Sequence, residues 1–148
     1  MKVRVLWPGK TRQSYYRSAI EDYAARIGKM VDFEVVETRE PPSLKDKHQK
    51  HRVKAESSHL QAKRKAPVCV VLDGSGKEMT SDEFAGWLAR TATDIDFILG
   101  GPVGLDAPSG AVKLSLGKMT YPHELARVIV LEQIYRALTI LKGIPYHK

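Results

Sequence analysis

The sequence predicts a single α/β domain over residues 1–148, with a mainly parallel sheet of five or six strands and helices on both faces. Two observations support this prediction. Segments of strand length alternate with segments of helical periodicity along the whole chain, which is typical of parallel β-α units. The length of 148 residues suits one domain, and 43% hydrophobic with 28% charged residues is an ordinary globular composition.

The first part of the chain predicts a strand, a helix and a second strand. Residues 2–7 and 32–38 alternate polar and apolar side chains, which is the period of a half-buried strand. Between them, apolar side chains recur at helical spacing, and Gly28 marks the end of the predicted helix. The members of this apolar face are Tyr16, Ala19, Ile20, Tyr23, Ala24 and Ile27.

A second helix, strongly basic, is predicted to begin at Ser43, with Asp46 three residues further on. Its apolar stripe is thin and consists of Leu44, Val53 and Leu60. Residues 45–65, the basic segment, carry eight Lys and Arg side chains against two acidic ones, so +6 of the net charge of +7 lies here. The eight are Lys45, Lys47, Lys50, Arg52, Lys54, Lys63, Arg64 and Lys65. Clustered cations favour a polyanionic partner, and the alternative is a solvated helix face.

The middle of the chain predicts two further strands with a helix between them. Residues 68–72 form an apolar run, typical of a strand covered on both faces, and residues 73–76 predict a loop after it. Thr80 begins a capping box for a third helix, whose apolar face contains Phe84, Trp87 and Leu88. Residues 96–99 predict a strand that leads into the glycine-rich turn at residues 100–104.

The last third predicts a short helix over residues 107–113, a strand over residues 116–121, and a long helix from Pro122 to Leu141. Hardly any polar face is left on the long helix. Its apolar side chains include Val128, Ile129, Val130, Leu131, Ile134, Ala137, Leu138 and Ile140. Such a helix must be covered on nearly all sides, so we expect cover from the core and from a second subunit in a homodimer.

Composition and motifs also exclude several classes of protein. No apolar run has the roughly 18 residues of a membrane span, and the start of the chain lacks a secretory signal, so we expect a cytoplasmic protein with no membrane partner. The lone Cys69 lies in an apolar run, which argues against thiol catalysis. No metal is expected, because nothing near His48, His51 and His59 completes a usual set of ligands.

Three predicted strand ends carry sequences that suit a ligand crevice, because the carboxyl ends of parallel strands meet at one edge of a sheet. These are Leu72-Asp73-Gly74, the glycine turn at residues 100–104, and Thr120-Tyr121-Pro122. The glycine turn lacks the GxGxxG and P-loop patterns, which disfavours a general nucleotide-binding enzyme. Its glycines let a flat or anionic ligand approach the backbone, and the alternative is a tight connector.

Several motifs, taken together, resemble the large-subunit ribosomal RNA methyltransferase H family, of the SPOUT class, over essentially the whole chain. The motifs are Leu72-Asp73, residues 98–105 (ILGGPVGL), residues 119–128 (MTYPHELARV), residues 132–137 (EQIYRA) and the end Pro145-Tyr146-His147-Lys148. The resemblance implies a C-terminal trefoil knot and a homodimer. It also implies methylation of N3 of pseudouridine 1915, in helix 69 of 23S rRNA in the assembled ribosome, with S-adenosyl-L-methionine as cofactor.

The resemblance further implies where the cofactor binds: Leu72, Gly101, Gly117, Lys118, Met119, Thr120, Tyr121 and Pro122. Methyl transfer from a sulfonium needs in-line positioning and a way to remove the N3 proton. We expect His123 or the tail His147, beside Tyr146, to take this proton, and Arg127 or Arg136 to stabilise the anion; the tail could reach across the dimer. The basic segment would dock on the ribosome. A non-catalytic ribosome-binding or RNA-binding factor of the same fold is the alternative.

Overall fold

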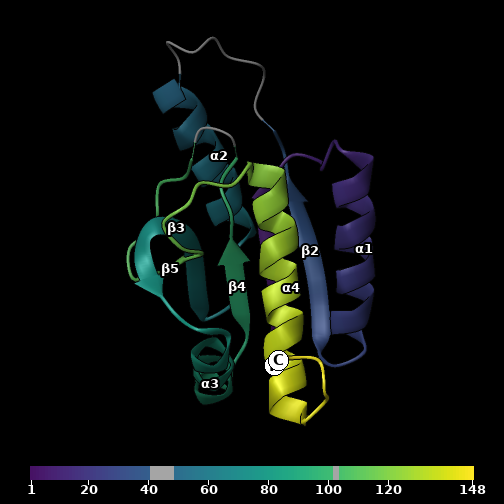
Figure 1. Cartoon of the computed structure of the whole chain (residues 1–148). Helices are drawn as coiled ribbons and strands as arrows, with labels where there is room; N and C mark the ends of the chain where they lie inside the picture. The colour runs from purple at the N-terminus through teal and green to yellow at the C-terminus, as the bar shows by residue number, and fades with distance from the viewer. Residues whose placement is uncertain (41–48, 102–103) are drawn as a thin grey trace.

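A computed structural model of the chain, which describes residues 1–40, 49–101 and 104–148, contains one five-stranded parallel sheet (Figure 1). The order of the strands is β2-β1-β4-β3-β5, and this arrangement confirms the predicted α/β class. The strands are β1 (Lys2–Pro8), β2 (Asp32–Thr38), β3 (Val68–Glu78), β4 (Ile95–Ile98) and β5 (Val112–Ser115). The helices are α1 (Ser14–Gly28), α2 (Gln49–Lys63), α3 (Ser81–Thr91) and α4 (His123–Lys142).

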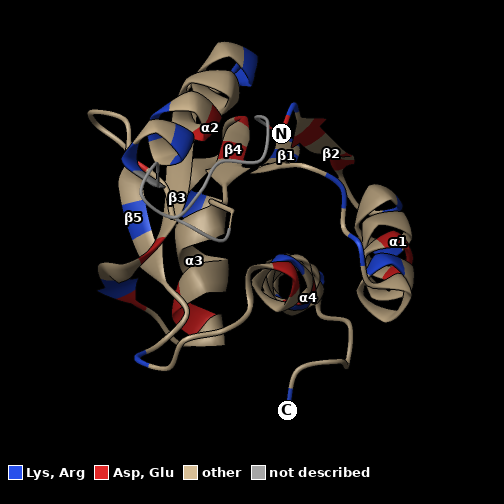
Figure 2. Ribbon diagram, turned by 90° about the horizontal axis from the view of Figure 1, so that it is seen from above, with Lys and Arg blue, Asp and Glu red and all other residues tan. Residues whose placement is uncertain are grey.

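Helices cover both faces of the sheet, as the sequence predicts, but unequally. Helices α1, α3 and α4 lie on one face and α2 lies on the other (Figure 2). Alternation along β1 divides its side chains between two hydrophobic clusters: Val5 and Trp7 join the larger cluster with α1, α3 and α4, while Leu6 joins Leu60 of α2 in the smaller one.

A buried ion pair fixes the carboxyl end of α2 to the sheet. The Arg4 guanidinium donates to both carboxylate oxygens of Asp96, at 2.9 and 2.8 Å, and also to the carbonyl of Lys63 at 2.9 Å. Asp96 is fully buried and also accepts the backbone N–H groups of Lys65 and Ala66, at 2.8 and 3.0 Å. The link from α2 to β3 is therefore held by a side chain of the central strand β4.

Three predictions for the region around β3 and β5 are wrong. Residues 73–76 are not a loop: β3 continues through them to Glu78, with a register shift between Leu72 and Lys77. Gly76 permits this, since a Cβ there would lie 2.6 Å from the backbone of β5. The last strand is β5, residues 112–115, and neither the strand over 116–121 nor the helix over 107–113 forms.

Two glycines with positive φ angles explain where β5 begins and ends along the chain. Gly110 has φ +78° and follows Pro108, whose carbonyl accepts the N–H of Ala111 at 3.3 Å, so residues 108–111 form a turn. Gly117 has φ +114°, a conformation that L side chains rarely adopt, and it ends the extended backbone after Ser115.

The predicted boundaries of the helices fare better. Thr80 caps α3 by accepting the N–H of Glu83 at 3.1 Å. Helix α1 ends at Gly28, and α4 has Pro122 as its N-cap. The predicted start of α2, with Ser43, Leu44 and Asp46, lies outside the described residues.

Helix α4 is partly covered within its own chain, and Leu141 near its end is 43% exposed. It packs against α1 and α3, and none of residues 124–140, all of which are described, is exposed. The homodimer and the trefoil knot stay predictions. Among the described residues, no helix is long and apolar enough to cross a membrane.

Candidate functional site

The turn after β5 lines a cavity of about 320 Å³ together with residues of β3. Of the predicted cofactor residues, Leu72, Gly117, Lys118, Met119, Thr120 and Tyr121 all line this cavity. Asp73, Gly74, Leu114, Leu116 and Ala126 complete the walls. Segments more than forty residues apart therefore meet here.

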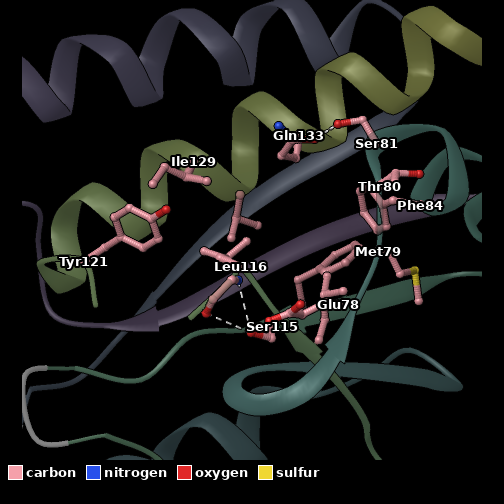
Figure 3. A pocket seen from close by; sticks show the side chains of 14 residues that line it. Glu78, Met79, Thr80, Ser81, Phe84, Ser115, Leu116, Tyr121, Ile129 and Gln133 are labelled. Carbon is pink, nitrogen blue, oxygen red and sulfur yellow. Dashed lines mark hydrogen bonds between the residues drawn. The ribbon is translucent and has the colours of Figure 1, made fainter. Parts of the chain in front are cut away.

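A second cavity, of about 380 Å³, adjoins the first and shares Leu114, Leu116, Gly117 and Tyr121 with it (Figure 3). Its walls are largely apolar and come from α3, α4, β3 and β4, with Phe84, Phe97, Ile129 and Val130 among them. Polar groups gather at one side, where the Ser81 hydroxyl donates to the Gln133 carbonyl oxygen at 2.7 Å. Sequence reasoning missed Ser81 and Gln133 as lining residues, although Gln133 lies in the motif at residues 132–137 and Ser81 follows the capping residue Thr80.

A side chain of β5 holds the backbone of the turn after this strand in place. The Ser115 hydroxyl accepts the N–H of Gly117 and donates to its carbonyl, both at 3.1 Å, which fixes the backbone. The Met119 side chain is 80% exposed, and Lys118 is exposed as well. Backbone N–H and C=O groups together with the apolar Leu72 and Leu114 suit a flat, partly polar ligand.

Gly101 and Pro122, the other two predicted cofactor residues, are not among the lining residues of either cavity. Gly101 is buried, and its carbonyl accepts the N–H of Gly104 at 3.1 Å, which closes the turn after β4. A Cβ at Gly101 would lie 2.8 Å from a carboxylate oxygen of Glu56, so a larger residue here would require the Glu56 side chain to shift. Pro102 and Val103 of the same turn lie outside the described residues.

Two predicted catalytic residues, His123 and Arg127, lie at the amino end of α4. His123 is half-buried, and desolvation followed by the charge of Arg127 lowers the pKa of its imidazole below the ordinary 6.5. Arg127 is 1% exposed; its guanidinium donates to the Thr11 hydroxyl at 3.0 Å and the Pro8 carbonyl at 2.7 Å, over the Trp7 ring. Burial lowers the pKa of Arg127, and its contacts clamp the end of β1.

The other three predicted catalytic residues gather at the carboxyl end of α4, around Glu132. This carboxylate accepts from Arg136 at 2.9 and 2.7 Å and from the Tyr146 hydroxyl at 3.0 Å. The His147 ring lies 3.1 Å from the Arg136 guanidinium and 3.4 Å from the Asp82 carboxylate. Hydrogen bonding to Glu132 raises the pKa of Arg136, while burial and hydrogen bonds raise that of Tyr146. Sequence reasoning missed Glu132, although its spacing to Arg136 was a usable signal.

The structure does not bring these two groups together within one chain. Thirteen residues of α4 separate His123 from Arg136, which at 1.5 Å per residue is about 20 Å. His123 lies beside the turns at the carboxyl edge of the sheet, whereas the tail lies near α3 (Figure 1).

Lys and Arg residues occur at several places along α2 in the described part of the basic segment (Figure 2). Lys50, Lys54, Lys63 and Lys65 are exposed, whereas Arg64 is half-buried and donates to Gln61 at 3.2 Å. Arg52 is 18% exposed in its side chain and pairs with Glu56 at 2.9 Å and Glu40 at 3.3 Å, so internal carboxylates take up its charge. Lys45 and Lys47, like His48, lie outside the described residues. Within the described parts of the chain, no cluster of three His, Cys, Asp or Glu could hold a metal ion.

Comparisons with known proteins match this chain over essentially its whole length. A family model described as a predicted SPOUT methyltransferase matches residues 1–147. The chain is 36% identical, over all of both chains, to a protein of Clostridium beijerinckii named ribosomal RNA large subunit methyltransferase H. It is 38% identical, over 99% of both chains, to a protein of that name from Bacteroides fragilis.

A solved structure, a probable methylase family protein from Haemophilus influenzae, has a similar fold. The TM-score is 0.56 at 11% identity, and the match covers 95% of this chain and 66% of that one. At this identity the likeness concerns the fold alone.

Proposed function

Because the chain belongs to the SPOUT methyltransferase family and, within it, to the ribosomal RNA large subunit methyltransferase H family, we propose that it methylates the RNA of the large ribosomal subunit. The proposed target is N3 of pseudouridine 1915 in helix 69 of 23S rRNA, in the assembled ribosome. One observation carries the proposal: Leu72 and the turn at residues 117–121, which the family resemblance marks as cofactor residues, line one cavity.

S-adenosyl-L-methionine, when bound, supplies an electrophilic methyl group. The turn would hold the adenosyl portion through backbone groups, since the side chains of Lys118 and Met119 are exposed. Leu114 and Leu116 give both cavities an apolar wall, against which nucleophile and methyl group would be positioned.

We take His123 as the base for the N3 proton, because it lies two residues after Tyr121 of the cavity, at the start of α4. Burial and the nearby Arg127 lower the pKa of the imidazole, so the ring is neutral at neutral pH and able to accept a proton. Arg127 contributes a positive potential from below the surface, because its guanidinium is already engaged by Thr11 and Pro8.

The tail side chains Tyr146 and His147, with Arg136, complete the proposed site from a second protomer. The proposal of a homodimer rests on their distance from His123 within one chain. The exposed lysines of α2 would dock on ribosomal RNA, because phosphate contacts position a protein without reading sequence. We place the enzyme in the cytoplasm, where its ribosomal substrate lies.

The test is methyl transfer from labelled S-adenosyl-L-methionine to ribosomes that lack the modification, compared with naked 23S rRNA, with the labelled nucleoside identified. We expect label on pseudouridine, in assembled ribosomes only. Label on a different nucleoside would show that the proposed target nucleoside is wrong. Binding of protein to ribosomes without any label would instead support the non-catalytic binding factor.

A further inference from the structure

Glu124, a buried carboxylate of α4 that the proposed reaction does not use, holds the loop after β1 against this helix. Its Oε1 atom accepts the backbone N–H groups of Arg12 and Gln13, both at 3.0 Å. Arg127, one turn further along α4, donates to two oxygens of residues 8–11. These four hydrogen bonds fix the carboxylate at the amino end of α4, where only 7% of Glu124 is exposed.

The second oxygen of the Glu124 carboxylate lies next to the proposed base. Oε2 is 3.9 Å from Nε2 of His123. Among the described residues, both hydrogen bonds that the carboxylate accepts go to Oε1, so Oε2 keeps its charge toward the ring. Burial alone would raise the pKa of Glu124, but the N–H groups of Gln13 and Arg12 outweigh burial and lower it. The carboxylate is therefore charged at neutral pH.

The His123 ring lies among charges of both signs. Burial and then Arg127 lower the pKa of the imidazole, whereas the carboxylates of Glu124, Glu40 and Glu56 act in the opposite direction. Glu40 and Glu56 are already held in ion pairs by an arginine of α2. Glu124 instead receives its hydrogen bonds from neutral backbone groups. It is therefore the carboxylate whose charge opposes Arg127 at the ring.

We propose that Glu124 is a positioning residue for the methyl transfer: anchored by the loop after β1, it supplies the charge that keeps His123 an effective base beside the buried Arg127. The inference rests on the proposed function, because it takes His123 as the acceptor of the N3 proton. That proton passes from N3 to the imidazole, and the electron pair left on N3 takes the methyl group. The imidazolium then lies beside a carboxylate, which favours its formation.

The first measurement is the titration of His123, followed by NMR in the full chain with labelled histidine; the His123→Gln variant identifies the signal. Glu124→Gln removes the charge but keeps an oxygen that can accept the two N–H groups of the loop. Glu124→Asp keeps the charge but shortens the reach to the loop. Glu83→Gln is the matched control, because Glu83 is an exposed carboxylate in the first turn of α3. Thermal unfolding of each variant shows whether the fold is kept.

The second measurement is the pH profile of single-turnover methyl transfer to ribosomes that lack the modification. In Glu124→Gln, the His123 titration and the pH below which the rate falls should both move to lower pH, because the imidazolium has lost its counter-charge. Above that pH, the rate should fall by up to about fivefold, the effect of one unit charge at about 4 Å in a water-like dielectric. Glu83→Gln should leave both measurements unchanged.

The two substitutions of Glu124 separate its charge from a merely structural role. If the charge matters, Glu124→Asp should stay closer to the wild type than Glu124→Gln. A structural role gives the reverse order, because glutamine preserves the hydrogen bonds to the loop that aspartate weakens. If Glu124→Gln does not fold, Glu124→Asp decides alone: a wild-type pH profile supports the inference, and a profile displaced to lower pH refutes it.

The outcomes distinguish this inference from the proposed function. If the wild type transfers methyl groups but folded Glu124→Gln titrates like Glu83→Gln, the inference is refuted and the proposed function stands. A displaced His123 titration with an unchanged pH profile of methyl transfer also refutes it. If the wild type transfers no methyl group, the proposed function fails and this inference fails with it, whatever the titration of His123 shows.

Discussion

Asp96→Asn should be the most destabilising single exchange near α2. The carboxylate is fully buried and accepts four hydrogen bonds, two from Arg4 and one each from the N–H groups of Lys65 and Ala66. An amide would leave the Arg4 charge, on a side chain that is 6% exposed, without its counter-charge. Breaking a buried pair by removing one partner costs about 3–5 kcal/mol.

That cost is a large fraction of the stability of a domain of this size. At roughly 2–4 °C per kcal/mol, the melting temperature should fall by about 6–20 °C. Asp94→Asn is the matched control, because Asp94 is exposed and accepts the N–H of Lys2, a hydrogen bond that an amide oxygen can also accept. The free energy of unfolding of both variants is measured by urea unfolding at one fixed protomer concentration.

The carboxylate of Asp96 should also make the stability of the fold depend on pH. Burial alone would raise the pKa of Asp96, but the hydrogen bonds from Arg4, Lys65 and Ala66 outweigh it and hold the pKa below the ordinary 3.8. The stabilisation is therefore present above pH 3.8 and is lost as pH falls through the folded pKa. Equal unfolding free energies for Asp96→Asn and Asp94→Asn at neutral pH would refute the reasoning.

Two further predictions concern the site. Gly117→Ala should weaken S-adenosylhomocysteine binding, measured by calorimetry, because an alanine at φ +114° strains the backbone of the turn. Such strain costs of order 1–3 kcal/mol. The control is Gly28→Ala, since no atom lies within 4 Å of a Cβ built at Gly28. Single-turnover methyl transfer should stay constant as pH falls through 6.5 and drop only below it, because burial and Arg127 lower the pKa of His123. A pH profile unchanged by His123→Gln would assign the proton to another base.

The sequence predicts those parts of the fold that local pattern determines. The strand predicted at residues 2–7, the α1 face ending at Gly28 and the Thr80 cap all depend on neighbours within a few residues. The predictions are wrong where contacts with a segment distant in sequence determine the local structure. Residues 73–76 look like a loop, yet β5 supplies the partner that extends β3 to Glu78.

In the candidate site, too, some features could be predicted from the sequence and others depend on distant contacts. Leu72 and residues 117–121, which the family resemblance marks as cofactor residues, line one cavity. The expected reason, two strand ends that meet at one sheet edge, is wrong in detail, because β3 continues past Leu72 to Glu78 and residues 117–121 form no strand. The burial of Arg52 could not be predicted in full from the sequence, because Glu40 reaches it only after the chain folds; the four-residue spacing from Arg52 to Glu56 was a usable signal for the second ion pair. A count of cationic residues therefore overestimates the charge that α2 presents to RNA.

The placement of the tail constrains any mechanism that uses both ends of α4. Gly143, at φ +68°, ends the helix and turns the chain back, and Tyr146 and His147 are then held by Glu132, Arg136 and Asp82. Reaching His123 within one chain would require breaking these contacts and spanning about 20 Å. In a two-fold dimer whose α4 helices cross in opposite directions, the tail of each protomer would lie beside the amino end of the other's α4, with every intrachain contact intact. A homodimer thus reconciles the fixed tail with the proposed base, and it predicts two identical sites, each built from both chains.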